Sequence, residues 1–197
     1  MNDYEKIMQI AIRNNNIFKT KMIVDAGIRK ERIRELLEKG EIKRIGHGFY
    51  SICGNKTNLY YELQQRISQG IFSYSTAAFL WNLLDKAPEI IDCTVPRGYN
   101  TSRLRLSTTV NFHYVLQEYY EIGLIEIETS DGCKIRVYDK ERIVCDFIKH
   151  RNKTDPKLFS QVLNSYFKSR DKDVRKLAKY GRIFHIAEKL EMYMEVL

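Results

Sequence analysis

The sequence predicts an α+β protein with two domains, a winged helix-turn-helix at residues 1–54 and a larger α+β domain at residues 55–197 that ends in a helical bundle. Apolar residues recur with a helical period as far as residue 39, and an alternating pattern with glycine turns replaces it at residues 42–52. Beyond residue 59, several strand-like segments precede a helical C-terminal region that starts near Glu141.

Three helices are expected in the first forty residues. Their ranges are 4–13, 20–24 with Lys19 or Thr20 at the start, and about 29–39. Ile17 and Phe18 are expected to form a short buried connector between the first two. Gly27 and Gly40 are expected to end the second and third helices, because glycine tolerates the left-handed backbone of a helix C-terminus.

A small hairpin follows these helices. Strands are expected at residues 42–45 and 49–52, joined by the turn Gly46-His47-Gly48. Three helices followed by a hairpin is the element order of a winged helix-turn-helix, and the short turn at Gly27 fits the connection between its second and third helices.

The second domain is expected to start after the polar stretch Gly54-Asn55-Lys56-Thr57-Asn58. Helices are expected at 59–68 and 75–84, and strands at 90–95, 110–116, 122–128 and 134–138. Ser130-Asp131-Gly132 supplies the turn of a hairpin between the last two strands. From Glu141 onward the pattern is helical, with breaks expected near Pro156, Asp171 and Gly181.

Positive charge is concentrated in two regions of the chain, whose formal net charge is +8. Residues 1–50 hold 11 Lys and Arg against 7 Asp and Glu, and residues 149–182 hold 11 against 3. Residues 51–148, which lie between these regions, hold 10 Lys and Arg against 12 Asp and Glu. Clustered positive charge attracts polyanions, chiefly nucleic acid, although solvated helix faces have the same composition.

Several classes of protein are not supported by the sequence. No apolar run approaches the roughly 20 residues that span a bilayer, and no signal peptide is visible, so a cytoplasmic protein is expected. Cys53, Cys93, Cys133 and Cys145 lack the close pairs of a zinc site, and we expect them to be buried and free.

The third helix has the residues expected of a DNA-reading element. In a helix-turn-helix the N-terminal residues of the recognition helix meet base edges in the major groove, where the planar guanidinium of arginine grips guanine. The candidate base contacts are Arg29, Lys30, Arg32 and Arg34. Glu31 either accepts a hydrogen bond from cytosine or pairs with a neighbouring arginine.

Further basic residues are candidates for phosphate contacts. Lys19, Thr20 and Lys21 lie at the start of the second helix, and Lys43, Arg44 and His47 lie on the hairpin. A second DNA surface is expected in the C-terminal region, at Lys168, Arg170, Lys172, Arg175, Lys176 and Lys179. The alternative is a winged helix that binds protein in place of DNA.

No catalytic or cofactor-binding residues are predicted, so the protein is not expected to be an enzyme. Phosphate-binding, dinucleotide-binding and nucleophile-elbow motifs are absent, and His47, His113, His150 and His185 are isolated in the sequence. Glu126, Glu128, Asp131 and Lys134 surround a hairpin and resemble a Mg²⁺ nuclease site, but their order differs from the usual one. A solvated hairpin edge and no metal are therefore expected.

The segment 138–146 has a structural interpretation. Asp139 is expected to cap the helix that follows, and Arg142 and Asp146, four residues apart, are expected to form a salt bridge on one helix face.

Four motifs in order resemble the AbiEi antitoxins of the AbiE abortive-infection systems, over nearly the whole chain. The chain departs from that family at Arg29, where Ser or Thr often caps the recognition helix, and at Trp81-Asn82-Leu83, where His-Gly is frequent. The matching segments are 27–50, 74–83, 94–98 with Arg103 and Arg105, and 138–146, and the final helices at 177–197 also fit.

This resemblance implies an antitoxin of a type IV toxin–antitoxin pair with a role in phage defence. It implies repression of the protein's own operon through inverted repeats in the promoter. It also implies that the second domain counters a nucleotidyltransferase-like toxin without a stable complex. The rival interpretations are a Mg²⁺-dependent nuclease targeted by a winged helix and a protein-binding adaptor.

Overall fold

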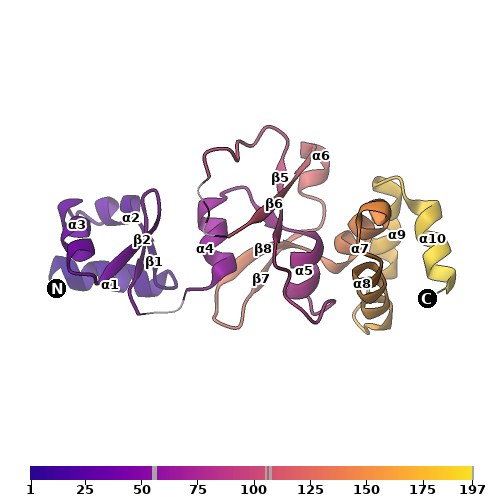
Figure 1. The fold of residues 1–197 in the computed structure, drawn as a ribbon, viewed down its shortest axis with the longest axis horizontal. Coiled ribbons are helices and arrows are strands. Elements are labelled where there is room, and N and C mark those ends of the chain that lie inside the picture. The colour runs from indigo at the N-terminus through magenta and orange to yellow at the C-terminus, as the bar shows by residue number, and fades with distance from the viewer. Residues whose placement is uncertain (55–56, 105, 107, 197) are drawn as a thin grey trace. The chain divides into compact units, whose positions relative to one another are not determined.

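The computed structural model describes residues 1–54, 57–104, 106 and 108–196, and shows a mixed α+β chain (Figure 1). The chain forms two compact units. The first unit contains Met1–Ser68, Ser102–Ser107 and Glu128–Ile135, and the second contains Gln69–Thr101, Thr108–Ile127 and Arg136–Leu197. The domain boundary at residue 54 stays a prediction, because Asn55 and Lys56 of the predicted linker lie outside the described residues, as do Arg105 and Leu197 of the matched segments.

Three helices surround the core of the N-terminal region, as predicted. They are α1 (Asp3–Arg13), α2 (Thr20–Asp25) and α3 (Glu31–Glu38). A capping box between Asn2 and Glu5 starts α1. The inward faces supply Ile7, Ile23, Ile33 and other residues of one apolar cluster. Helix α3 begins two residues later than expected, since Arg29 and Lys30 form the turn before it.

The hairpin is confirmed, and Ile17 and Phe18 are buried between α1 and α2 as expected, although their strand conformation was not predicted. These residues begin β1 (Ile17–Lys19), which pairs antiparallel with β3 (Phe49–Ile52), and β3 pairs with β2 (Ile42–Gly46). The sheet order is β1-β3-β2. The strand forms because β3 of the hairpin offers a free edge to β1, and Phe18 stacks on Tyr50 at 5.4 Å between ring centroids.

Helix α4 (Leu59–Arg66) follows the linker and also belongs to the first unit. The Asn58 side chain caps this helix by accepting from the Tyr61 backbone N–H, and its amide donates to Asp131 at 3.0 Å. These contacts fix both the start of α4 and the turn at residues 129–132.

A five-stranded mixed sheet has the order β6-β5-β4-β8-β7. Strands β5 and β6 are parallel, β4 and β8 are parallel, and β4 and β5 are antiparallel. Strand β4 is central but was not expected, because two residues are too few to show an alternating pattern. The bounds are β4 Ile71–Phe72, β5 Ile91–Pro96, β6 Val110–Val115, β7 Leu124–Glu128 and β8 Lys134–Tyr138.

Helical segments complete the second unit. Helix α5 lies against β5, and helices α8, α9 and α10 surround the buried helix α7 (Figure 1). The four-residue helix α6 was not expected. The bounds are α5 Tyr74–Leu80, α6 Gln117–Tyr120, α7 Lys140–Lys149, a 3-10 turn Arg151–Lys153, α8 Pro156–Lys168, α9 Val174–Ile183 and α10 Ala187–Val196.

The break expected near Gly181 is displaced, because this glycine lies inside α9. A Cβ at Gly181 would lie 2.8 Å from Cδ2 of Leu190 on α10. The glycine therefore permits close packing of two helices and does not end α9, whose C-terminal cap is Phe184.

The interpretation of residues 138–146 is confirmed. The Asp139 side chain accepts from the Arg142 backbone N–H at the start of α7, and Arg142 pairs with Asp146 at 3.0 Å with both side chains buried. All four cysteines are free, and all except Cys53 are buried. Within the described residues, no helix is long and apolar enough to cross a membrane.

Candidate nucleic-acid interface

The start of α2 is attached to the turn of the hairpin. The Thr20 backbone N–H donates to the carbonyl oxygen of Gly48 at 2.9 Å. The Lys19 ammonium lies 5.1 Å from the ring centre of Phe49, and Lys21 is exposed. The structure therefore brings the two predicted groups of phosphate contacts, from α2 and from the hairpin, to one side of this unit.

The four predicted base contacts differ in their ion pairs. Arg29 and Lys30 are exposed in the turn before α3, and the described part of the chain offers neither of them a salt-bridge partner. Arg32 instead pairs with Glu35 at 2.6 Å and with Asp3 at 3.5 Å. Arg34 pairs with Glu38 at 2.9 Å, although its side chain is 83% exposed. The uncompensated charge thus lies just before the helix.

The hairpin presents three exposed basic residues, Lys43, Arg44 and His47. The Arg44 Nε donates to the Gly46 carbonyl at 3.1 Å, and its Nη2 lies 3.2 Å from Nδ1 of His47. A guanidinium can only donate, so Nδ1 of His47 accepts and carries no proton in this arrangement. The turn therefore holds the arginine side chain in a defined direction.

A cavity of about 770 Å³ beside the hairpin reveals two basic residues that sequence analysis did not assign as contacts. Arg66 from the end of α4 and Arg103 line it with Arg44 and His47, and none of the described lining residues is acidic. The Arg66 Nε would lie 3.1 Å from a Cβ at Gly46. Arg66 carried no sequence signal, and Arg103 entered only through the family resemblance.

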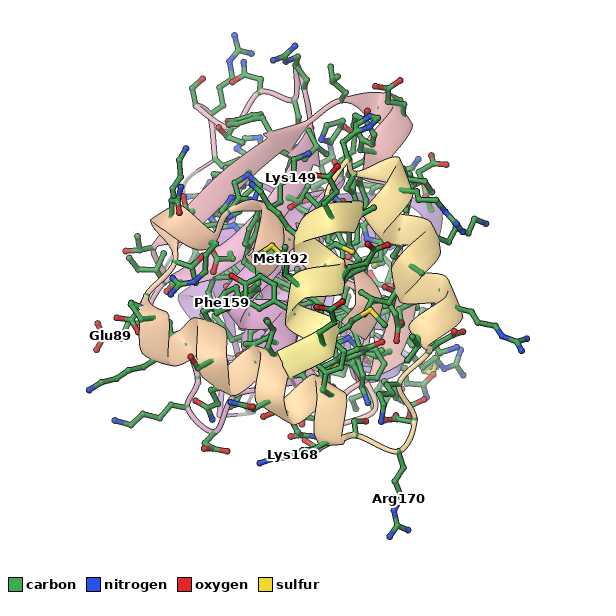
Figure 2. The ribbon with its side chains drawn as sticks, turned by 90° about the vertical axis from the view of Figure 1, so that its right-hand side faces the viewer. Glu89, Lys149, Phe159, Lys168, Arg170 and Met192 are labelled. Carbon is green, nitrogen blue, oxygen red and sulfur yellow. The ribbon has the colours of Figure 1, made fainter. Side chains whose placement is uncertain are left out.

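The residues of the second predicted DNA surface differ in their exposure and in their hydrogen-bond and ion-pair partners. Lys168 ends α8, and Arg170 in the following loop points away from the helices (Figure 2). Lys172 donates to the Ser169 carbonyl, whereas Arg175 and Lys179 are exposed one turn apart on α9. Lys176 is half-buried and pairs with Asp139 at 2.9 Å and Glu141 at 3.4 Å.

The environment of Lys176 indicates a structural role. Partial burial lowers the pKa of this ammonium, but the hydrogen bond to Asp139 and the charges of Asp139 and Glu141 raise the pKa overall to about 12. Its charge is already compensated by two carboxylates, so it adds little attraction for a polyanion.

The acidic residues of the β7–β8 hairpin behave as a solvated edge. Glu126, Glu128, Asp131 and Lys134 are all exposed. Hydrogen bonds from Asn58 and then Ser130 lower the pKa of Asp131. Among the residues that the structure describes, no group of three or more His, Cys, Asp or Glu side chains is placed to hold a metal ion.

Two comparisons with known proteins found matches. Residues 5–52 match the family model described as transcriptional regulator, AbiEi antitoxin. The crystal structure of the RV2827C protein from Mycobacterium tuberculosis has a TM-score of 0.61 and 12% sequence identity, and the match covers 95% of this chain and 76% of that chain. At this identity the likeness shows a shared fold. A comparison with curated proteins found no match.

Proposed function

We propose that this chain, whose residues 5–52 match the AbiEi antitoxin regulators, is a cytoplasmic antitoxin and a transcriptional repressor of its own operon. This proposal rests on one observation: the family match and the exposed cations involve the same residues. The matched residues are the same ones that hold the exposed cations of α2, of the turn before α3 and of the hairpin. A regulator with this surface is suited to DNA and needs no catalytic group.

In this proposal, residues 1–54 act as a winged helix-turn-helix, with α3 in the major groove. Arg29 and Lys30 at its N-terminal end are then the first side chains to meet base edges. Arg32 and Arg34 must exchange their glutamate partners for DNA. That exchange costs little, because exposed ion pairs contribute only about 0–1 kcal/mol.

The remaining contacts in this proposal position the protein on phosphates. Lys19, Thr20 and Lys21 serve one strand, and the hairpin residues Lys43, Arg44 and His47 serve as the wing. Arg66 and Arg103 extend the wing, because the described lining of their cavity holds several cations and no carboxylate. A backbone phosphate is a ligand that such a cavity accommodates.

The family match supports the antitoxin and regulator part of the proposed role, and the resemblance noted in the sequence suggests the rest. We assign binding to inverted repeats in the promoter, and a functional partner that is a nucleotidyltransferase-like toxin held in check without a stable complex. The second domain supplies the antitoxin activity in this scheme, so DNA binding and toxin neutralisation are separable functions of one chain.

A gel-shift experiment with the protein's own promoter tests the DNA-binding part. The full chain is expected to retard the promoter fragment in the presence of an excess of unrelated duplex, and to lower expression of a reporter fused to that promoter. Equal affinity for both DNAs would contradict operator recognition. No shift at all would favour the protein-binding adaptor, and Mg²⁺-dependent cutting of the fragment would favour the nuclease.

The toxin part is tested separately, with the gene that neighbours this one. Co-expression of this chain is expected to restore growth of cells that produce a nucleotidyltransferase-like protein from that gene. Failure of rescue with an intact gel shift would leave a repressor that is not an antitoxin.

The second basic surface, at Lys168, Arg170, Lys172, Arg175, Lys176 and Lys179, stays a proposal whose members differ in expected effect. Replacing Arg175 and Lys179 together by Gln should flatten the dependence of log affinity on log salt by about 0.9 for each phosphate that the variant no longer neutralises. Lys176→Gln is the matched control, and it should lower the melting temperature and leave the salt slope unchanged. An unchanged slope in the double variant would exclude α9 from the DNA surface.

A further inference from the structure

Two histidines that are distant in sequence meet at one cavity of the second unit. The cavity measures about 400 Å³ and is lined from β5, β6, α5, α7 and the loop that leads into α8. His113 on β6 and His150 at the end of α7 both line it, together with Tyr74 and Lys153. The fold thus brings both imidazoles into contact with one tyrosine ring.

His113 is held by a carboxylate. Its Nε2 lies 2.7 Å from Oδ1 of Asp92 on the neighbouring parallel strand β5. Asp92 is itself fixed, since its Oδ1 accepts from the Asn111 amide at 3.0 Å and its Oδ2 accepts from the Ser75 backbone N–H at 3.3 Å. The Asn111 amide also lies 3.2 Å from this nitrogen, but the carboxylate contact is shorter and a carboxylate accepts, so we assign the proton to Nε2 and the lone pair of the His113 ring to Nδ1.

His150 is held by a backbone carbonyl. Its Nδ1 lies 3.1 Å from the Asp146 carbonyl oxygen, which can only accept, so Nδ1 carries a proton. The Tyr74 hydroxyl oxygen lies 3.1 Å from the same nitrogen. For both rings, the second nitrogen has no hydrogen-bond partner among the residues that the structure describes.

Tyr74 contacts both imidazoles and has a strained backbone. Its ring stacks on His113 with centroids 4.0 Å apart and meets the His150 ring edge-on at 5.6 Å. Its φ angle is +44°, in the left-handed region that non-glycine residues rarely adopt. Such strain is concentrated at functional sites, where the surrounding structure maintains it.

The described lining of the cavity holds one lysine, Lys153, and two carboxylates, Asp92 and Asp155. Lys153 is exposed at its edge. The pKa of the Tyr74 hydroxyl is raised far above its usual value, mainly by burial, so the phenol stays protonated. The Thr154 hydroxyl already donates to the His150 carbonyl at 3.0 Å. Ser75 is the remaining hydroxyl of the described lining, and a substrate that brings its own nucleophile suits this site.

We infer that this cavity is an acid–base site that cleaves single-stranded RNA at a phosphodiester bond. RNA carries the required nucleophile, the ribose 2′-hydroxyl next to the phosphate. Nδ1 of His113 takes the 2′-hydroxyl proton, and the 2′-oxygen attacks phosphorus. The bond from phosphorus to the 5′-oxygen of the next nucleotide breaks, and His150, protonated on both nitrogens, gives that oxygen a proton from Nε2.

The products of this step are a 2′,3′-cyclic phosphate and a free 5′-hydroxyl, so one proton is taken up and one is released. Lys153 stabilises the negative charge that develops on the phosphoryl oxygens. Asp92 is a positioning residue that keeps the lone pair of His113 directed toward the substrate. The inference goes beyond DNA binding by the first unit and does not depend on it.

The experiment incubates the full chain with an unstructured RNA in the presence of EDTA and analyses the ends of the fragments. Cleavage with cyclic phosphate and 5′-hydroxyl ends is expected, whereas the same sequence with 2′-O-methyl riboses should stay intact. His113→Ala and His150→Ala should each slow cleavage by about 100-fold or more, and Lys153→Ala by about 100-fold. His185→Ala, at an exposed imidazole of the same unit, is the matched control and should keep full activity.

Three outcomes would overturn the inference. The first is intact RNA after incubation with the wild-type protein, and the second is cleavage that persists in the His113 and His150 variants purified in the same way. The third is cleavage of the 2′-O-methyl strand by the wild-type protein. This test uses no variant, so its result does not depend on whether a variant folds. A gel shift that fails while RNA is still cleaved would refute DNA binding and leave this inference standing.

Discussion

Arg142→Met is expected to lower the free energy of unfolding by about 3–5 kcal/mol at pH 7, because removal of one partner leaves a buried charge uncompensated. The Arg142 and Asp146 side chains are 3% and 7% exposed. The Arg142 Nη1 also donates to the carbonyl oxygens of Tyr119 at 2.8 Å and Ile122 at 2.9 Å. The substitution therefore leaves one carboxylate and two carbonyls without their donor.

The loss should depend on pH with a defined sign. Burial raises the pKa of Asp146, and Arg142 opposes that rise. In the variant, the folded-state pKa then stands further above the unfolded value of about 3.9. The stability contribution of such a group is fully present below the unfolded pKa and is lost as pH rises through the folded pKa. The variant should thus be closer to wild type near pH 4 than at pH 7.

Denaturant unfolding at both pH values measures this effect. Arg34→Met removes an exposed ion pair of the same spacing and is the matched control, with an expected change of less than about 1 kcal/mol. The double change Arg142→Met with Asp146→Leu should recover part of the loss, since no buried charge remains. A loss no larger than that of the control would show that the buried pair is not important for stability.

The second large effect is expected in DNA binding, if the proposed function is correct. Replacing Arg29 and Lys30 by Ala should weaken binding to the promoter by about 100-fold, because each base contact contributes about 1–3 kcal/mol. Binding to unrelated duplex should fall much less, since phosphate contacts from α2 and the hairpin remain. Fluorescence anisotropy at one fixed salt concentration measures both affinities.

Arg34→Ala is the comparison variant for that measurement, because in the proposal Arg34 also contacts DNA but must first leave Glu38. Its effect on promoter affinity should be smaller than that of the Arg29 and Lys30 change. If the Arg29 and Lys30 variant has the same affinity for the promoter, and the same affinity for unrelated DNA, as Arg34→Ala, the turn before α3 does not read sequence. If Arg34→Ala is the more damaging change, Arg34 makes a stronger base contact than the turn before α3.

Local patterns gave most of the fold correctly. Helical periodicity located α1, α2 and α3, and glycine turns with alternating residues located the hairpins β2–β3 and β7–β8. Asp139 and the Arg142–Asp146 pair were also predicted, because caps and four-residue spacings are local features. The short strands β1 and β4 were missed, since their structure depends on pairing with distant strands and not on their own pattern.

The sequence by itself determined where positive charge is concentrated and which segments become helices, because both depend on neighbours in the chain. Only the tertiary structure decided what each charge does. It paired Lys176 with two carboxylates and left Lys179 exposed. It also brought His113 and His150 together across Tyr74. The physical reason is that ion pairs and shared cavities form between residues far apart in sequence, whose separation only the packing of strands and helices sets.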